Sequence, residues 1–134
     1  MAAKKIELLT VQLEPKPGTL EKVYAAFREA KVNIIATWAY QMGPESAQAH
    51  FYASDVGKAK GVLEKLGRSP KVEHACYVEG TDEVGRYHDL LKKIADAKVN
   101  IEATDAIAVG GKFATLFFAQ PDAIAKLCAA VDAK

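Results

Sequence analysis

Apolar residues recur at steps of three and four between positions 20 and 30, in the stretch PGTLEKVYAAFREAKVNI that spans residues 17–34. This period places apolar side chains on one face of a helix and charged side chains on the other. The apolar face comprises Leu20, Val23, Tyr24, Phe27 and Ala30, and the polar face Glu21, Lys22, Arg28 and Glu29. Pro17 and Gly18 precede the helix as turn residues. The β-branched and aromatic residues of 33–41 then predict a strand.

The same pattern returns 67 residues later. Residues 84–107, VGRYHDLLKKIADAKVNIEATDAI, match residues 17–40, and the five residues 30–34 are identical to residues 97–101. Gly18 thereby corresponds to Gly85, and Asn33 to Asn100. A repeat of this length indicates a tandem duplication.

Hydrophobic periodicity along the whole chain predicts six strands and four helices. The strands are expected at 5–13, 33–41, 47–53, 72–79, 100–109 and 113–120, and the helices at 19–31, 55–66, 85–98 and 121–131. Gly43-Pro44 and Gly110-Gly111 are typical of hairpin turns. Only one predicted strand, 72–79, separates the second helix from the third, and none is predicted after the last helix.

Each repeat combines a strand, a strand-to-helix loop, a helix that starts with glycine, and Val-Asn-Ile before the next strand. This unit resembles the ACT domain, and the resemblance covers nearly the whole chain as repeats 1–68 and 69–134. It implies an α+β fold of two ferredoxin-like (βαββαβ-type) repeats with antiparallel sheets, in a family that binds amino acids and regulates metabolic enzymes or transcription. Two complete modules would contain eight strands, so we expect the closing strand of each repeat to be missing or shared.

A missing closing strand leaves backbone hydrogen-bonding groups on a sheet edge. We expect these edges to be covered, either because the two halves join side by side or because two chains pair. The expected assembly is therefore a homodimer formed through sheet edges or helix faces. The alternative is a pair of tolerated, twisted edges.

Composition narrows the class of protein. The formal net charge is +1, and the lysines and arginines are spread along amphipathic helices, so we expect no nucleic-acid partner. Glu7 and Thr10 interrupt the apolar N-terminal run, which predicts neither a secretory signal nor a membrane span. Cys76 and Cys128, the two cysteines, lie in apolar patterns and are expected to be buried reduced thiols. The predicted location is the cytoplasm.

No catalytic motif is present. His50, His74 and His88 are far apart, and the sequence contains no HExxH, CxxC, Gly-x-Ser-x-Gly, P-loop or Gly-x-Gly-x-x-Gly motif. We therefore expect no catalytic residue, no metal and no cofactor. His50 and His74, which lie in strand patterns, are expected to be structural, as are the aromatic residues Trp38 and Tyr40.

The first turn of each long predicted helix is a candidate anion site. Unpaired backbone amides and the helix dipole favour a carboxylate there, and a glycine lets ligand atoms approach the backbone. Asp82, three residues before Gly85, is an acceptor for an ammonium group. Asn33 and Asn100 precede apolar strand residues and have side chains that both donate and accept.

The ACT resemblance implies a ligand between two domains, held by the strand-to-helix loop of one and the start of the second strand of the other. The family's Asp-x-Pro-Gly loop matches residues 82–85 except that Val84 replaces proline, and residues 15–18 except that Pro15 replaces the acidic residue. We favour the second loop with Asn33. The candidate ligand-binding residues are Asp82, Val84, Gly85, Arg86, Tyr87, Asn33, Ile34, Gly18, Thr19, Leu20, Asn100 and Ile101. Turn, cap and strand-start roles are the structural alternatives for the same residues.

The sequence thus predicts a non-catalytic sensor that binds an amino acid between ACT-like modules and regulates amino-acid metabolism. A second hypothesis is a regulatory subunit that contacts a metabolic enzyme or a transcription factor and has no ligand of its own. An enzyme is the third alternative and would require an acid, base or nucleophile constellation that the sequence lacks.

Overall fold

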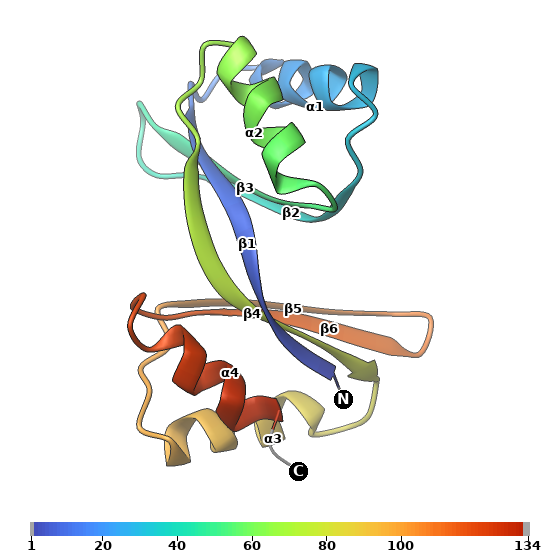
Figure 1. Cartoon of the computed structure of the whole chain (residues 1–134), viewed down its shortest axis with the longest axis vertical. Helices are drawn as coiled ribbons and strands as arrows, with labels where there is room; N and C mark the ends of the chain where they lie inside the picture. The colour runs from blue at the N-terminus through green and yellow to red at the C-terminus, as the bar shows by residue number, and fades with distance from the viewer. Residues whose placement is uncertain (1, 133–134) are drawn as a thin grey trace. The chain divides into compact units, whose positions relative to one another are not determined.

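The computed structural model describes residues 2–132 as an α+β fold with six strands and four helices, as the sequence predicts (Figure 1). The strands are β1 (Ala2–Leu13), β2 (Ile34–Gln41), β3 (Ala47–Ala53), β4 (Lys71–Thr81), β5 (Ala103–Val109) and β6 (Lys112–Phe118). The helices are α1 (Thr19–Glu29), α2 (Val56–Lys65), α3 (Arg86–Asp96) and α4 (Ile124–Asp132). The sheet has the order β2-β3-β1-β4-β6-β5.

The chain divides into two compact units, and both long strands contribute to each. Unit 1 contains residues 2–6 and 74–132, and unit 2 contains residues 7–73. Each unit therefore receives its closing strand from the long strand that begins the other repeat. This sharing accounts for six strands where two separate βαββαβ modules would need eight, and it agrees with the predicted fold class.

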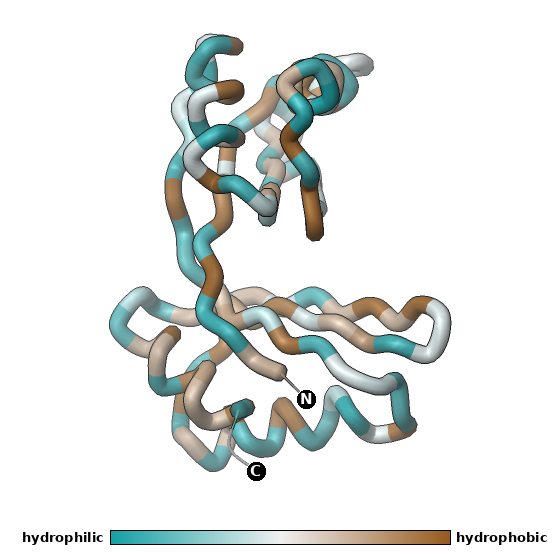
Figure 2. The backbone as a smooth tube through the Cα atoms, turned by 45° about the vertical axis from the view of Figure 1, so that its right-hand side comes forward, coloured by the Kyte–Doolittle hydropathy of each residue, from teal (hydrophilic) through white to brown (hydrophobic). Residues whose placement is uncertain are grey.

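Each unit has its own apolar core on the helix-covered face of its strands. In unit 2, Val23 and Phe27 of α1 and Leu63 of α2 pack on buried strand residues. In unit 1 the equivalent core forms around Leu90 and Ile94 of α3. Apolar and polar segments alternate along the strands (Figure 2) because successive side chains point to opposite faces.

The identical stretches 30–34 and 97–101 end the helices in the same way. Lys31 and Lys98 both have φ of 59°, the left-handed conformation that usually belongs to glycine. The amide of Val99 donates to the carbonyl of Ile94 at 3.3 Å, and that of Lys98 to Ala95 at 2.9 Å. This pattern is a Schellman motif, in which two otherwise unpaired carbonyls are satisfied.

Strand β5 begins at Ala103, three residues later than the predicted start at Asn100. The intervening Ile101 packs on the core of unit 1. The amide of Glu102 still donates to the carbonyl of Phe118 at 2.8 Å, but the regular ladder starts only at Ala103. The β-rich composition predicted the strand but not where regular pairing starts.

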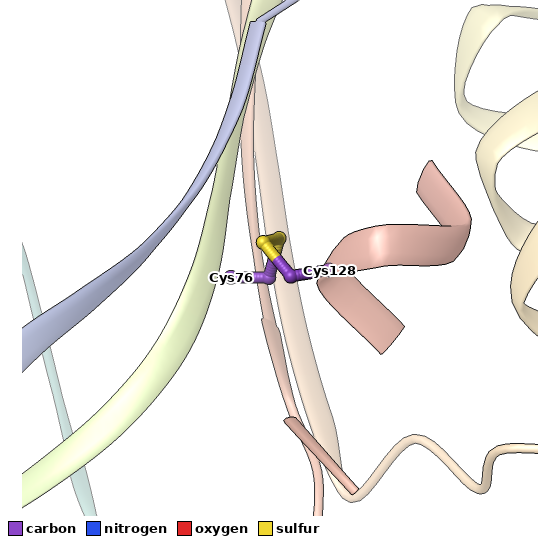
Figure 3. The surroundings of a disulfide bond; sticks show 2 residues. All are labelled: Cys76 and Cys128. Carbon is purple, nitrogen blue, oxygen red and sulfur yellow. A yellow bond between two sulfur atoms is a disulfide. The ribbon is translucent and has the colours of Figure 1, made fainter. Parts of the chain in front are cut away.

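The cysteines correct one prediction. Both side chains are buried as expected, but Cys76 of β4 and Cys128 of α4 form a disulfide and not two reduced thiols (Figure 3). Their Cα atoms are 5.4 Å apart, within the range that a disulfide spans. Packing of α4 against the sheet brings together residues 52 positions apart, and local sequence patterns contain no information about that contact.

We expect reduction of the disulfide to destabilise the protein substantially. A bond that closes 52 residues lowers the entropy of the unfolded chain, which corresponds to roughly 4 kcal/mol. Urea unfolding with and without a phosphine reductant measures the difference. The Cys76→Ala/Cys128→Ala variant serves as the control, since reductant should not change its midpoint. Equal midpoints for the oxidised and reduced wild type would contradict the prediction.

The left-handed backbone conformation of Lys31 and Lys98 predicts that a glycine substitution would stabilise the protein. Lys98→Gly removes the steric cost of a side chain at positive φ and should raise the free energy of unfolding by about 1 kcal/mol. The matched control is Lys60→Gly inside α2, which should lower it by about 1 kcal/mol. A loss of stability in Lys98→Gly, measured by chemical denaturation, would show that the lysine makes a compensating contact.

Candidate functional site

Helices α1 and α3 begin in the same unusual way. Their N-cap residues are Gly18, with φ of 87°, and Gly85, with φ of 85°, and no side chain caps either helix. Serine, threonine, aspartate and asparagine are preferred at this position because their side-chain oxygens accept from the first-turn amides, which glycine cannot do. The amides of Thr19 and Arg86, the first of each helix, donate to the loop carbonyls of Lys16 and Glu83 at 3.4 and 3.1 Å. Each helix terminus therefore offers an acceptor its next first-turn amides and the positive end of the helix dipole.

The first loop of unit 2 adjoins a hollow of about 360 Å³. Its walls include Thr19 and Leu20 from the first turn of α1, and the small residues Ala39 and Ala47 from the β2–β3 hairpin. Thr19 is buried, and its hydroxyl donates to the carbonyl of Lys16 at 3.1 Å. Tyr40 and Gln41 of the same hairpin also line the hollow, which lies next to an uncapped helix terminus, as a small-molecule site requires.

The acidic residue beside this loop has a cationic partner. Both Glu14 oxygens accept hydrogen bonds from the Arg68 guanidinium. This contact holds the pKa of the Glu14 carboxyl below its ordinary value. Glu14 is therefore not a free acceptor for a ligand ammonium group.

The second loop, in unit 1, is more polar. The amide of Asp82 donates to the carbonyl of Gly111 at 3.0 Å, which anchors the loop while the carboxylate keeps its own capacity to accept. Arg86 forms an ion pair with Glu83 at 2.8 Å, and its buried Nε has no hydrogen-bond partner in residues 2–132. Val84, which replaces the family's proline, is fully exposed.

Tyr87 connects the first turn of α3 to the sheet. Its hydroxyl is 2.7 Å from the Thr104 hydroxyl on β5, and its ring stacks on Phe117 of β6 with centroids 5.9 Å apart. The orientation of Tyr87 is therefore fixed by two strands. Tyr87 thus links the first turn of α3 to strand β5.

The two candidate asparagines lie at the opposite ends of their helices from the glycines. Asn33 follows α1, whose 11 residues span about 16 Å, and Asn100 follows α3 in the same way. The carbonyl of Asn33 accepts from the Ser54 amide at 3.0 Å, whereas Ile34 and Ile101 pack on the two cores. Neither unit brings its own glycine loop and asparagine together.

Sequence reasoning missed a polar cluster on the face of the unit 2 sheet opposite α1 and α2. His50 is buried with its ring stacked between Trp38 and Tyr40, at centroid distances of 4.9 and 5.7 Å. Its Nδ1 is 2.8 Å from the Thr10 hydroxyl and its Nε2 3.3 Å from the Tyr40 hydroxyl, which donates to Gln48 at 3.1 Å. From the sequence, alternation within each strand shows only which residues share a face. The register between strands brings these residues together, and the sequence does not give it.

The part of the chain that the structure describes contains no group of three or more histidine, cysteine, aspartate or glutamate residues able to hold a metal ion. None of its helices is long and apolar enough to cross a membrane.

A family model described as "ACT domain pair" matches residues 4–128. The chain belongs to this ACT family. No curated protein sequence matches it. Among solved structures, protein BT0572 from Bacteroides thetaiotaomicron has a TM-score of 0.83 and 17% identity over 93% of this chain and 87% of that one. The ligand-free regulatory subunit of aspartate kinase from Thermus thermophilus has a TM-score of 0.70 and 16% identity over 97% and 93%.

A third similar structure, the regulatory subunit of aspartate kinase from Thermus flavus, has a TM-score of 0.65 and 15% identity over 97% of this chain and 93% of that one. At these identities the likeness establishes the fold. Together with the family match, it shows that this ACT pair resembles regulatory subunits in architecture.

The conformation of Gly85 predicts a cost for any side chain there. Among the described residues, apart from the two chain neighbours, an added Cβ would meet no atom within 4 Å, so the penalty comes from positive φ and should be about 1–2 kcal/mol in Gly85→Ala. The control is Gly61→Ala in α2, where space is also open and φ is not positive. Gly61→Ala should gain up to about 1 kcal/mol. Equal effects in thermal unfolding would refute the assignment of Gly85 to the left-handed region.

Proposed function

We propose that this ACT pair is a non-catalytic regulatory protein that binds an α-amino acid at the first turn of α3 or α1. The observation that carries the proposal is the pair of uncapped helix termini, each entered through a left-handed glycine at the same position of its repeat. Backbone amides there can donate to the ligand carboxylate, and the helix dipole favours its charge. The glycine leaves the approach open, since within residues 2–132 no atom other than those of the glycine and its two chain neighbours lies within 4 Å of the position a Cβ would take.

The two loops differ in their capacity to bind the ammonium group of the ligand. Asp82 offers a carboxylate whose backbone is already anchored, whereas Glu14 is engaged by Arg68. We therefore propose the second loop, with Asp82, Gly85, Arg86 and Tyr87, as the principal site. An asparagine from another ACT module, Asn33 in our proposal, completes it.

Regulation in this proposal results from thermodynamic linkage between ligand binding and partner binding. A ligand that binds one arrangement of the modules more tightly shifts the population toward that arrangement, and a partner that prefers the same arrangement then binds better. The partner in this proposal is an enzyme of amino-acid metabolism. The structures of aspartate kinase regulatory subunits, which share this fold, support a regulatory role but not a particular amino acid.

The first test is thermal unfolding of the purified protein with each of the twenty amino acids. A ligand present at one hundred times its Kd stabilises the folded state by about 2.7 kcal/mol, which raises Tm by several degrees. We expect one amino acid to do so, and Asp82→Ala to abolish the shift. Asn33→Ala should weaken it, while the hydrogen bonds recorded for Asn33, which use its backbone carbonyl, are kept.

The matched control is Asp96→Ala at the other end of α3, which removes only an exposed ion pair with Lys92 and should leave the shift unchanged. A shift that survives Asp82→Ala would exclude the second loop. No shift with any amino acid would reject the sensor and favour a regulatory subunit that acts by protein contact alone.

A further inference from the structure

The two faces of the unit 1 strands differ. Helices α3 and α4 pack on one face, where Phe113 and Phe117 belong to the core (Figure 1). Because successive strand residues alternate between faces, Glu79, Ala114 and Ile107 form a row on the opposite face, in which both Glu79 and Ile107 pair with Ala114. A hollow of about 420 Å³ lies at this row. Its volume is within the range of small-molecule sites.

The hollow is open because Ala114 is small. The repeat alignment places Gln48 of unit 2 at the position of Ala114, and Tyr40 at the position of Ile107. The Tyr40 hydroxyl donates to Gln48 at 3.1 Å, and the Tyr40 ring stacks on His50. In unit 2, therefore, two larger side chains bonded to each other occupy the position that is open in unit 1. The open space is a property of the unit 1 side chains and not of the fold.

The β4 side of the hollow presents a carboxylate held in place. The Tyr77 hydroxyl donates to one oxygen of Glu79 at 2.9 Å, and the Lys4 ammonium lies over the Tyr77 ring, 5.8 Å from its centroid. These contacts fix the ring, and the ring orients the carboxylate. The carboxylate retains lone pairs that can accept from a cationic ligand group.

A cation lies at one end of the same hollow. Lys112 pairs with Thr81 of β4 and with Val109 of β5, one row beyond Ala114 on the same face. It is therefore a diagonal neighbour of Glu79, with Cβ atoms about 7 Å apart. Within residues 2–132 these two side chains form no ion pair with each other. Opposite charges at this separation match a molecule that carries both charges.

The β5 side of the hollow is apolar. Ile107 and Val109, which both line it, are 65% and 69% exposed. Covering these branched side chains with an apolar group removes them from water, which is favourable. A ligand with one apolar arm would therefore place that arm over β5 and its polar groups toward β4 and Lys112.

We propose that this hollow, the unit 1 face site, binds a small zwitterion with an apolar arm, of which leucine is a simple example. The ammonium group of the ligand lies against Glu79 and its carboxylate against Lys112. Its apolar arm covers Ile107 and Val109. Because the charged side chains are exposed, each ion pair contributes little, and we expect a dissociation constant in the millimolar range.

The unit 1 face site is separate from the helix-terminus site and does not depend on it. Residues of β4, β5 and β6 line the hollow, whereas the helix-terminus site belongs to the loop before α3 and its first turn. The two sites can therefore be measured separately in one protein sample.

The experiment is a leucine titration of isotope-labelled protein followed by NMR. The methyl signals of Ile107 and Ala114 report on the unit 1 face site, and the amide signal of Gly85 reports on the helix terminus. We expect millimolar leucine to shift both methyl signals in a saturable way. Shifts confined to Gly85 would overturn the face site and support the helix-terminus site. Methyl shifts with an unchanged Gly85 would support the face site alone.

Two leucine analogues test the charge assignment. Isoamylamine lacks the carboxylate and isocaproate lacks the ammonium group, so each should bind about fivefold more weakly than leucine, the loss of one exposed ion pair. Lys112→Gln should weaken leucine binding about fivefold without weakening isoamylamine. Glu79→Gln should weaken leucine binding to the same extent without weakening isocaproate. A merely structural role of either residue would weaken all three ligands together.

The shape of the hollow is tested by Ala114→Gln, which introduces the residue found at the equivalent position of unit 2. This variant should abolish the shift of Ile107, and Lys126→Gln on exposed α4 is the charge control that should leave the dissociation constant unchanged. Thermal unfolding verifies that each variant is folded, and the Lys112 and Glu79 variants decide the question if Ala114→Gln does not fold. Analogues that bind as tightly as leucine, or normal binding in a folded Ala114→Gln variant, would overturn the proposal.

Discussion

The hydrogen-bonding requirement of the sheet edges determines this architecture. Each unit has three strands of its own, and a module of about 67 residues buries a small core. Extending β1 and β4 so that each strand contributes to both units supplies the fourth strand of each without adding chain. Neither repeat can therefore be removed without leaving the other with an open edge. Stability of the two halves is coupled through these two strands.

Comparison of the two repeats distinguishes residues that the fold requires from residues that a site requires. Both units keep the left-handed glycine before the first helix and the left-handed lysine after it, and these positions define chain reversals. The open faces have diverged. Strand register places Tyr77 and Leu116 in unit 1 where unit 2 has Thr10 and His50. Because unit 1 folds without such a polar cluster, the cluster is not a requirement of the fold.

The sequence was sufficient for features that depend on local periodicity. The helical spacing of residues such as Val23 and Phe27 predicted a core-facing stripe, and both lie in the core of unit 2. Contacts between distant segments were not predictable in this way. The Cys76–Cys128 bond depends on how α4 packs on β4, and the surroundings of His50 depend on register across three strands. A pattern of apolar positions indicates burial but not which partner is buried alongside.

Within unit 1, one side chain joins the proposed amino-acid site to the edge strand β5. Tyr87 belongs to the first turn of α3, where the amino-acid carboxylate would bind, and its hydroxyl contacts Thr104 of β5 at 2.7 Å. Thr104 lies on β5, an edge strand of the sheet. A ligand bound at the first turn of α3 would restrict Tyr87 and, through this hydrogen bond, β5. A partner that binds this restricted arrangement more tightly would then bind better when the ligand is present. The coupling needs no large conformational change, since one side chain joins the helix terminus to the edge strand.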